Sequence, residues 1–413
     1  MELELSNVKA ELTVNANISR RMRSSLSGAG LALLVAFSMI FAEGCGSGKF
    51  FIPECQAYNT CSSSGGGGTS GGGGTSANSS YAYVANYNPG TIAGFPVPKT
   101  AFTSLSGTSY ALGTPPSAIA ANPNGTLLFV ATAAGGVFVY LINPSTGVLT
   151  LGNNGQPVTS TLNPTWMTVD PSGNWLFMVS NSSPQLLIFQ INPTDGVLTQ
   201  TNQGTIQLSN GNPTQIYVTP NGAHVFVGLG LGGADTFLFN PVNGMVSNQS
   251  HIRPLINGGS SDNTFGSDNK STYLFIGEAG AGIRVLAIGS NGTLNEIPGS
   301  PFPSQLGPQS IVVDPTNKFV YVANRTVNVI TGYSLATTGA LKQLASSPFQ
   351  TGSGPTQMAL DPTGKYIFVI CSGGNPDLQV FGFDATTAGK LDSVASATTG
   401  TQPAGAISLS VVP

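Results

Sequence analysis

Short apolar runs alternate with tight polar turns from about residue 80 to the end of the chain, and the pattern returns every 46 to 49 residues. Each unit starts with a proline and an apolar run, continues through a turn such as Asp361–Gly364, and then enters an aromatic-rich apolar run. Self-similarity of this length indicates a repeat architecture. The lead prolines are Pro116, Pro164, Pro213, Pro308, Pro355 and Pro403, and Asp262 occupies the one slot in the series without proline.

The last complete unit predicts four strands, over residues 356–360, 365–371, 378–383 and 391–397. Asp-Pro-x-Gly turns preset φ with proline and allow a left-handed position at glycine. The runs between turns are rich in Val, Ile, Phe and Tyr, which suit pleated surfaces, and none keeps the 3.6-residue period of a helix. Four-stranded units of this length arranged radially are propeller blades. We therefore predict an all-β fold, a seven-bladed β-propeller of four-stranded antiparallel blades.

One of the seven blades is expected to be split between the two ends of the repeat region. Residues 81–86 match the second strand of a unit, whereas residues 403–412 match a first strand and then stop. Pairing of these segments would close the ring and remove two open sheet edges. We expect residues 81–413 to form one domain, closed by a C-terminal strand that joins the N-terminal blade.

The residues before the repeats predict export. Arg20, Arg21 and Arg23 precede an apolar run over residues 31–42, which ends shortly before Cys45. This resembles a bacterial lipoprotein signal, so we expect residues 1–44 to be a targeting segment and Cys45 to be lipidated. The alternative is an uncleaved anchor helix, for which twelve apolar residues are short. We therefore expect the protein to be extracytoplasmic, either lipid-anchored in the cell envelope or secreted.

A glycine-rich linker separates this signal from the repeats. Residues 45–80 contain two Gly-Gly-Gly-Gly-Thr-Ser runs, which predict a flexible tether. In an oxidising compartment Cys55 and Cys61 are close enough in sequence to pair, but two cysteines are too few to indicate a metal site. Cys371 has apolar strand neighbours, and we interpret it as a buried, unreactive thiol.

Charge is scarce, and this limits the partners. Only 8% of the residues are charged, against about a quarter in an average soluble domain, so neutral polar groups must solvate the surface. No basic stripe is present to neutralise phosphates, which argues against a nucleic-acid partner. We expect a monomer.

Three repeats resemble the seven-bladed propeller lactonase family, which includes 6-phosphogluconolactonase-like and muconate-lactonising-like proteins. They read TWMTVDPSGNWLFMVSNSS, QSIVVDPTNKFVYVANRTVNVITGYSL and TQMALDPTGKYIFVICSGGNPDLQVFGFD, and the piece YAYVAN is similar to YVTN-type repeats. The resemblance covers roughly residues 80–413. It implies the propeller fold and hydrolysis of a cyclic ester in the central channel.

Candidate chemistry gathers around the Asp262 unit. In a blade the second-to-third turns and the crossings between blades share one face, and the Asp-Pro-x-Gly turns line the other, where their aspartates are expected to cap turns. A lactonase needs a base for water and a cation for the developing oxyanion. We therefore predict Glu278 and His251 as catalytic residues, whereas the predicted substrate-binding residues are Arg325, Arg284, Arg253 and Asp262.

Other interpretations of the charges and of the function stay open. The same residues can be ordinary loop charges and ion pairs, and His224 is interpreted as a packing residue. The first functional hypothesis is a lactonase for a neutral or carboxylated lactone. The second is a non-catalytic propeller that binds glycans, peptides or envelope proteins. A redox-cofactor propeller is a weaker third, because Trp166 and Trp175 share one unit, and we expect no cofactor and no metal.

Overall fold

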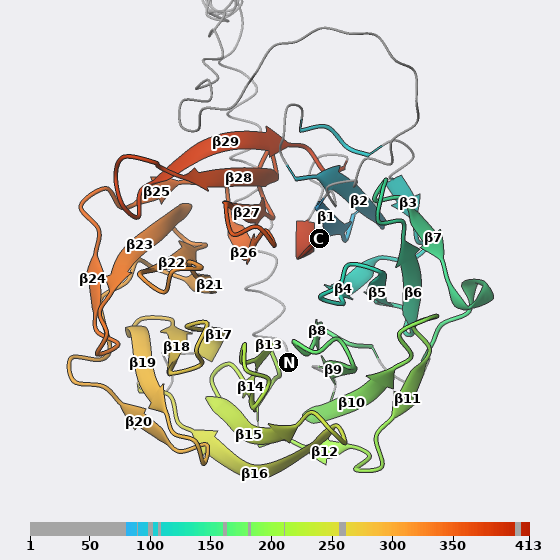
Figure 1. Ribbon diagram of the computed structural model, residues 1–413, viewed down its shortest axis with the longest axis horizontal. Helices are drawn as coiled ribbons and strands as arrows, with labels where there is room; N and C mark the ends of the chain where they lie inside the picture. The colour runs from blue at the N-terminus through green and yellow to red at the C-terminus, as the bar shows by residue number, and fades with distance from the viewer. Residues whose placement is uncertain are drawn as a thin grey trace, which may run out of the picture. The chain divides into compact units, whose positions relative to one another are not determined.

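The computed structural model describes residues 80–413 except for gaps at 89, 98–101, 106–108, 160–162, 181–182, 210, 256–261 and 401–405. Cys45, Cys55 and Cys61 lie outside the described residues, as do the signal and nearly all of the tether. Over the described part, seven antiparallel sheets surround a central channel (Figure 1), which confirms the predicted propeller. Its one helical element there is a 3₁₀ turn, η1 (Asn153–Gly155). None of the described segments forms a helix that is long and apolar enough to cross a membrane.

We number the blades in chain order and give each from the channel outward. The first blade is split and contains β30 (Ala406–Val412), β1 (Tyr81–Asn86), β2 (Thr91–Pro96) and β3 (Ser109–Ala111). The second contains β4 (Pro116–Ala121), β5 (Leu127–Thr132), β6 (Val137–Ile142) and β7 (Leu149–Leu151). The third contains β8 (Trp166–Val169), β9 (Trp175–Ser180), β10 (Gln185–Ile191) and β11 (Leu198–Gln200), with β12 (Ile206–Gln207) also paired to β10.

The fourth blade contains β13 (Gln215–Val218), β14 (His224–Gly228), β15 (Ala234–Asn240) and β16 (Met245–Ile252). The fifth contains β17 (Asp262–Ser267), β18 (Tyr273–Glu278), β19 (Gly282–Ile288) and β20 (Leu294–Glu296). The sixth contains β21 (Pro308–Val313), β22 (Phe319–Asn324), β23 (Val329–Leu335) and β24 (Leu341–Gln343), with β25 (Phe349–Gln350) beside β23. The seventh contains β26 (Pro355–Leu360), β27 (Tyr366–Cys371), β28 (Leu378–Phe383) and β29 (Leu391–Ala397), within one residue of the strands predicted from sequence.

Buried carboxylates hold the turns between first and second strands. Asp361 Oδ1 accepts hydrogen bonds from the backbone N–H groups of Lys365 and Tyr366, at 2.8 and 2.6 Å, and Oδ2 accepts one from that of Thr363 at 3.0 Å. Such bonds fix the turn because they satisfy backbone donors that no strand reaches. The aspartates are therefore turn caps, as predicted, and the same arrangement recurs at Asp170, Asp268 and Asp314.

Aromatic rings at the start of second strands pack on glycines of the next blade. Gly244 has φ +70°, and a Cβ there would lie 2.2 Å from the Trp175 ring, so both the backbone conformation and the close approach require glycine. His224 fills the ring slot in the fourth blade. It is 5% exposed and stacks with Phe226 at a centroid distance of 6.4 Å, which confirms it as a packing residue. Burial lowers the pKa of its imidazole.

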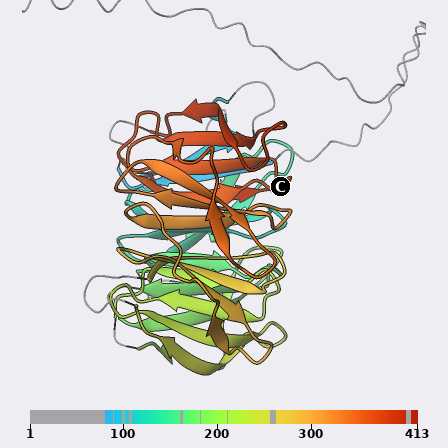
Figure 2. The same cartoon turned by 90° about the vertical axis from the view of Figure 1, so that its left-hand side faces the viewer.

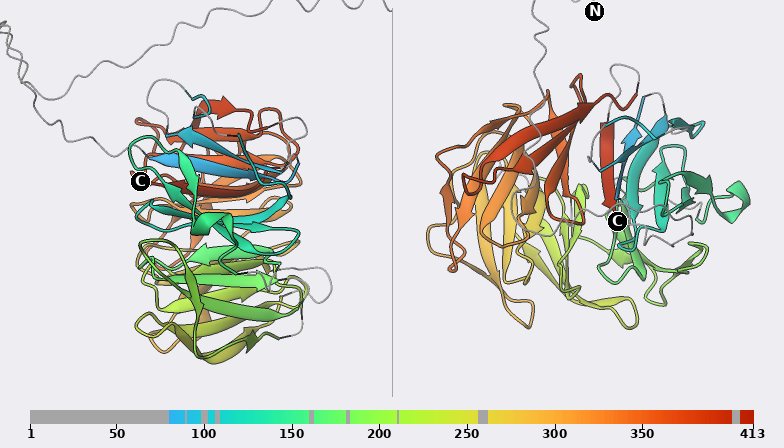
Figure 3. Two further views of the ribbon diagram at one scale, coloured as in Figure 1. Left: turned by 90° about the vertical axis from the view of Figure 1, so that its right-hand side faces the viewer. Right: turned by 45° about the horizontal axis from the view of Figure 1, so that its top comes forward.

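Two ends of the repeat region close the ring. β30 pairs antiparallel with β1 from Tyr81↔Val412 to Asn86↔Ala406, and Leu409 and Val412 are 3% and 2% exposed. Figure 3 shows this red strand beside the blue N-terminal strands, and Figure 2 shows the turns gathered at two opposite faces of the ring. The predicted closure is confirmed. Cys371, at the end of β27, is fully buried as predicted, and burial raises the pKa of its thiol to about 12.

We expect deletion of residues 406–413 to destabilise the whole propeller. The deletion exposes the edge of β1 and removes two buried side chains, each of which contributes about 1.5–3 kcal/mol. Thermal unfolding of the full chain should show one transition shifted to lower temperature, and a synthetic peptide of residues 403–413 should restore part of the shift. An unchanged transition after the deletion would show that β30 does not hold the ring.

Candidate functional site

A cavity of about 360 Å³ occupies the central channel and is lined by all seven innermost strands. It reaches the face of the Asp-Pro-x-Gly turns, where Pro220 and Asn269 line it. Among the described residues that line it, none is acidic, none is basic and none is a histidine. The described part of the channel therefore offers neither a carboxylate or imidazole base nor a cation for an oxyanion.

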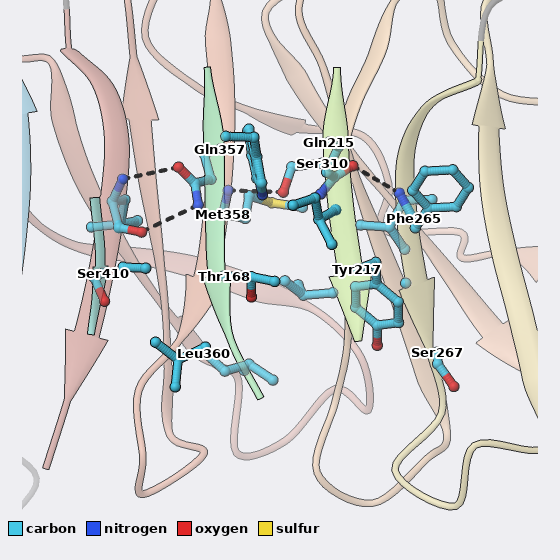
Figure 4. Close-up of a pocket in the computed structure, with 18 of the residues that line it drawn as sticks. Thr168, Gln215, Tyr217, Phe265, Ser267, Ser310, Gln357, Met358, Leu360 and Ser410 are labelled. Carbon is cyan, nitrogen blue, oxygen red and sulfur yellow. Dashed lines mark hydrogen bonds between the residues drawn. The ribbon is translucent and has the colours of Figure 1, made fainter. Parts of the chain in front are cut away.

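Polar side chains in the upper part of this cavity join neighbouring blades (Figure 4). Gln215 Oε1 accepts a hydrogen bond from Phe265 N at 3.1 Å, and Ser310 Oγ accepts one from Met358 N at 2.9 Å. Gln357 accepts from the backbone N–H of Leu409 at 2.9 Å and donates to its carbonyl at 3.2 Å. These side chains satisfy the edges of the inner strands, so their structural role is clear.

The first charged pair lies at the outer edge of the fourth blade. His251, near the end of β16, is the register partner of Asp235 on β15, and its Nδ1 lies 2.9 Å from Asp235 Oδ1. The Asp235 carboxylate is fully buried and its Oδ2 accepts hydrogen bonds from Ser209 N at 2.7 Å and Gln249 Nε2 at 3.0 Å. The His251 side chain is 33% exposed. The carboxylate is thus fixed, and it orients an imidazole that solvent can reach.

The second charged pair lies in the fifth blade. Glu278, the last residue of β18, is fully buried, and its Oε1 lies 3.4 Å from Arg284 Nη1. Arg284 Nη2 also reaches Glu296 Oε2 at 3.1 Å. Each acid can offset the guanidinium charge, which the burial of Arg284 makes necessary. Glu278 is therefore neutralised and shielded from solvent, whereas His251 is not.

The Glu278–Arg284 pair holds the crossing from the fourth blade to the fifth, whereas Asp235 bonds the crossing from the third blade to the fourth. Arg284 Nη1 donates to the carbonyl of Arg253 at 2.9 Å, and Glu278 Oε2 accepts from the N–H of Leu255 at 3.2 Å. Asp235 and His251 share the face of the fourth sheet that packs on the third blade, because Asp235 bonds Ser209. Arg284 lies on the face of the fifth sheet that packs on the fourth, together with Leu286.

The other three predicted residues are Arg253, which lies in this crossing, Asp262 and Arg325. Arg253 is exposed and has no ion-pair partner within the described part of the chain. Asp262 is the backbone register partner of Glu278. Arg325 is exposed in the turn after β22, where its N–H bonds the carbonyl of Gly307 at 2.7 Å. The structure thus groups His251, Arg253, Arg284 and Glu278 around one crossing and places Arg325 in the next blade.

A polar groove of about 600 Å³ opens between the outer strands of the fourth and fifth blades. Arg253 and Arg284 border it, and His251 contributes to its edge although its imidazole lies against Asp235 on the other face of the fourth sheet. The other polar groups along it are the amides and hydroxyls of Thr236, Asn248, Ser250, Asn291, Thr293 and Asn295. The groove therefore combines cationic groups with many neutral hydrogen-bonding groups.

Asp235 is the residue that the sequence analysis did not assign. An imidazole that donates Nδ1–H to a buried carboxylate keeps a lone pair on Nε2, which is the arrangement of a general base. The pairing depends on a register shift between Thr236 and Leu238, so hairpin spacing alone does not reveal it. Across the described residues no group of three His, Cys, Asp or Glu side chains is arranged to hold a metal ion.

Comparison with known proteins gives a family model and structural neighbours. The model "Lactonase, 7-bladed beta-propeller" matches residues 102–217, 141–254 and 209–407. A "putative 6-phosphogluconolactonase" of Bacteroides fragilis shares 18% identity with a TM-score of 0.66, over 82% of this chain and 99% of that one. The periplasmic gluconolactonase of Pseudomonas aeruginosa shares 18% identity with a TM-score of 0.62, over 81% and 99%.

A third neighbour carries an unrelated name. Hydrazine synthase of Kuenenia stuttgartiensis shares 14% identity with a TM-score of 0.56, over 74% of this chain and 92% of that one. No curated protein matches the chain. Likeness at these identities shows the fold, and proteins with different activities share it.

Replacing Arg284 by methionine should destabilise the protein by about 3–5 kcal/mol, because it leaves the buried Glu278 carboxylate without its cation. The double variant Arg284→Met/Glu278→Gln should recover much of this loss, since glutamine is neutral and still accepts from Leu255 N–H. Urea unfolding of the full-length variants measures both. Equal loss in the single and double variants would mean that the ion pair contributes nothing to holding the crossing.

Proposed function

Since the chain belongs to the seven-bladed β-propeller lactonase family, we propose that it hydrolyses a lactone, with His251 as the general base. The observation that supports this choice is the 2.9 Å contact between His251 Nδ1 and the buried Asp235 carboxylate. Of the two histidines in the sequence, His224 is buried in a blade interface and His251 is reachable. The reaction is assigned to the crossing because the described channel residues include no base.

The proposed reaction uses one water molecule. His251 Nε2 takes a proton from water, and the resulting hydroxide attacks the lactone carbonyl carbon. The guanidinium of Arg253, two residues beyond His251 in the sequence, stabilises the oxyanion of the tetrahedral intermediate. The ring C–O bond then breaks, and the imidazolium returns its proton to the leaving alkoxide. The product is an open-chain hydroxy acid.

The charge of the groove indicates which substrate charge it can bind. Beyond the predicted signal the chain has three arginines, and Arg284 is already paired with Glu278 and Glu296. One exposed guanidinium suits a single carboxylate or a neutral ring better than a phosphate dianion. We therefore propose a neutral or carboxylated lactone. Arg325 and Asp262 remain candidate substrate-binding residues, and Glu278 is assigned to positioning the crossing.

A second candidate function is non-catalytic glycan binding. It is favoured by the groove of about 600 Å³, whose amide and hydroxyl side chains can hydrogen-bond sugar hydroxyls. Under this proposal an oligosaccharide binds the full chain and loses affinity in Asn291→Ala, whether or not any lactone is hydrolysed. Peptides or envelope proteins are the other partners proposed for this surface.

We further propose that the protein works outside the cytoplasm, anchored by lipid at Cys45. The support is the sequence of the signal, and the periplasmic gluconolactonase of Pseudomonas aeruginosa is a neighbour whose name gives that location. In a bacterial host, radiolabelled palmitate should be incorporated into the wild-type chain and not into Cys45→Ala. Equal labelling of both would exclude Cys45 as the anchor.

His251→Ala should lower kcat/KM for a hydrolysed lactone by at least about 100-fold, because a positioned base contributes about 10²–10⁴-fold. Asp235→Asn should lower kcat more than it raises KM, since it disturbs the orientation of the imidazole and not binding. Stopped assays of lactone loss against a panel of neutral and carboxylated lactones measure these values.

The matched control is Lys365→Ala, an exposed cation at the opposite face, which should leave the rate unchanged. Glu278→Gln separates the two base candidates. A folded Glu278→Gln variant that is inactive, beside an active His251→Ala, would reverse the assignment of the base. Hydrolysis at the same slow rate in all variants would reject catalysis at this crossing.

A further inference from the structure

We infer that the central channel holds a second binding site, for a small uncharged ring molecule with hydroxyl groups on one edge and an aliphatic face. This site is separate from the crossing of the fourth and fifth blades, and nothing in the proposed hydrolysis uses it. The cavity of about 360 Å³ lies within the range of small-molecule sites, roughly 300–1,000 Å³.

Two levels of side chains line the cavity, and the upper level joins neighbouring blades. Gln215, Ser310 and Gln357 stand two residues after the lead proline of their units and bond the next inner strand. Two residues further along, side chains of the same strands point to the same side. Figure 4 shows Thr168 and Tyr217 at this lower level, below the glutamines and Ser310.

The lower level departs from the repeat in its hydroxyl groups, although Tyr217 also packs against the core between the fourth and fifth blades. Its slot holds alanine in the second blade, Ala120, and valine in the sixth, Val312, but hydroxyl-bearing Thr168 and Tyr217 in the third and fourth. Within the described residues the Thr168 hydroxyl makes no hydrogen bond. Tyr217 interacts with Ser267 of the fifth blade, and burial raises the pKa of its phenol well above the usual range. A neutral phenol can both donate and accept, so the Tyr217 hydroxyl can bond a ligand hydroxyl beside Ser267.

The opposite wall is aliphatic. Ala120, Val312, Met358 and Leu360 line the cavity from the second, sixth and seventh blades. A ring with carbon-bound hydrogens on one face and hydroxyls along one edge matches both walls, since apolar contact and two or three convergent hydrogen bonds are what orient small ligands. A pyranoside has this shape and size.

Charge excludes other ligands from this cavity. A carboxylate or phosphate moved into it would lose hydration and find no cation among the described lining residues, and an unpaired charge in such a site is strongly disfavoured. The channel and the groove beside Arg253 therefore differ in the ligand charge that they favour. The groove accepts a carboxylate, and the channel rejects one.

The test uses methyl β-D-glucopyranoside, which carries no ester, and its charged analogue methyl β-D-glucopyranosiduronate. Isothermal titration of the full-length protein should show binding of the neutral glucoside and at least about tenfold weaker binding of the uronate. Thr168→Val, which keeps the side-chain shape, should weaken glucoside binding about fivefold, as expected for the loss of one hydrogen bond. The control Thr150→Val, on exposed β7, should bind as the wild type does.

A second pair of variants keeps this inference apart from the proposed hydrolysis. His251→Ala should bind the glucoside unchanged, and Tyr217→Phe should weaken it. Thermal unfolding confirms that each variant is folded. The inference is overturned by equal binding of the glucoside and the uronate, by an unaffected Thr168→Val, or by no heat of binding up to the solubility limit of the glucoside.

Discussion

Each blade turns the hydrogen-bonding edge of its innermost strand toward the channel, and the ring depends on those edges finding partners. A free strand edge leaves polar backbone groups without partners and invites pairing with other chains. Here Gln357 bonds both backbone groups of Leu409, and Ser310 bonds Met358 N. β30 supplies the last inner strand by pairing with β1. This strand completes the first blade, and its Val412 and Leu409 belong to the apolar interfaces with the second and seventh blades.

Because charged residues are scarce in this chain, a few buried acids hold the crossings between blades. Asp235, Glu278 and Asp377 are at most 1% exposed, and each accepts backbone hydrogen bonds from a segment that crosses between blades. Charge-assisted bonds of this kind are stronger than neutral ones, so a few carboxylates hold the crossings in place. At Asp235 the same carboxylate also orients His251. The structural role and the proposed catalytic role are therefore joined in one side chain.

Because the chain has few charged residues, the crossing and the channel are chemically different environments. The charged groups lie at a crossing near the outer strands, where loops depart from the repeat. The channel is lined by backbone edges and neutral side chains of the repeat itself. A charged ligand would favour the crossing, because cations there can pair with it. A neutral polar ligand would favour the channel, where a charged ligand would pay a desolvation penalty.

The sequence by itself determined the blade count, the strands of the last unit, the split blade and the turn-capping aspartates. These follow from local rules, since alternation of apolar residues and Asp-Pro-x-Gly chemistry act over fewer than ten residues and repeat seven times. The same rules identified His224 and Cys371 as core residues.

Only the tertiary structure decided which charges meet. Asp235 pairs with His251 across a bulge that moves the register, and Glu278 is buried against Arg284 because two sheets pack face to face. The neutrality of the channel also emerges only when side chains from seven distant segments line one cavity. Register shifts and contacts between sheets depend on the whole ring, which is why a linear pattern located the charged sector but not the partners within it.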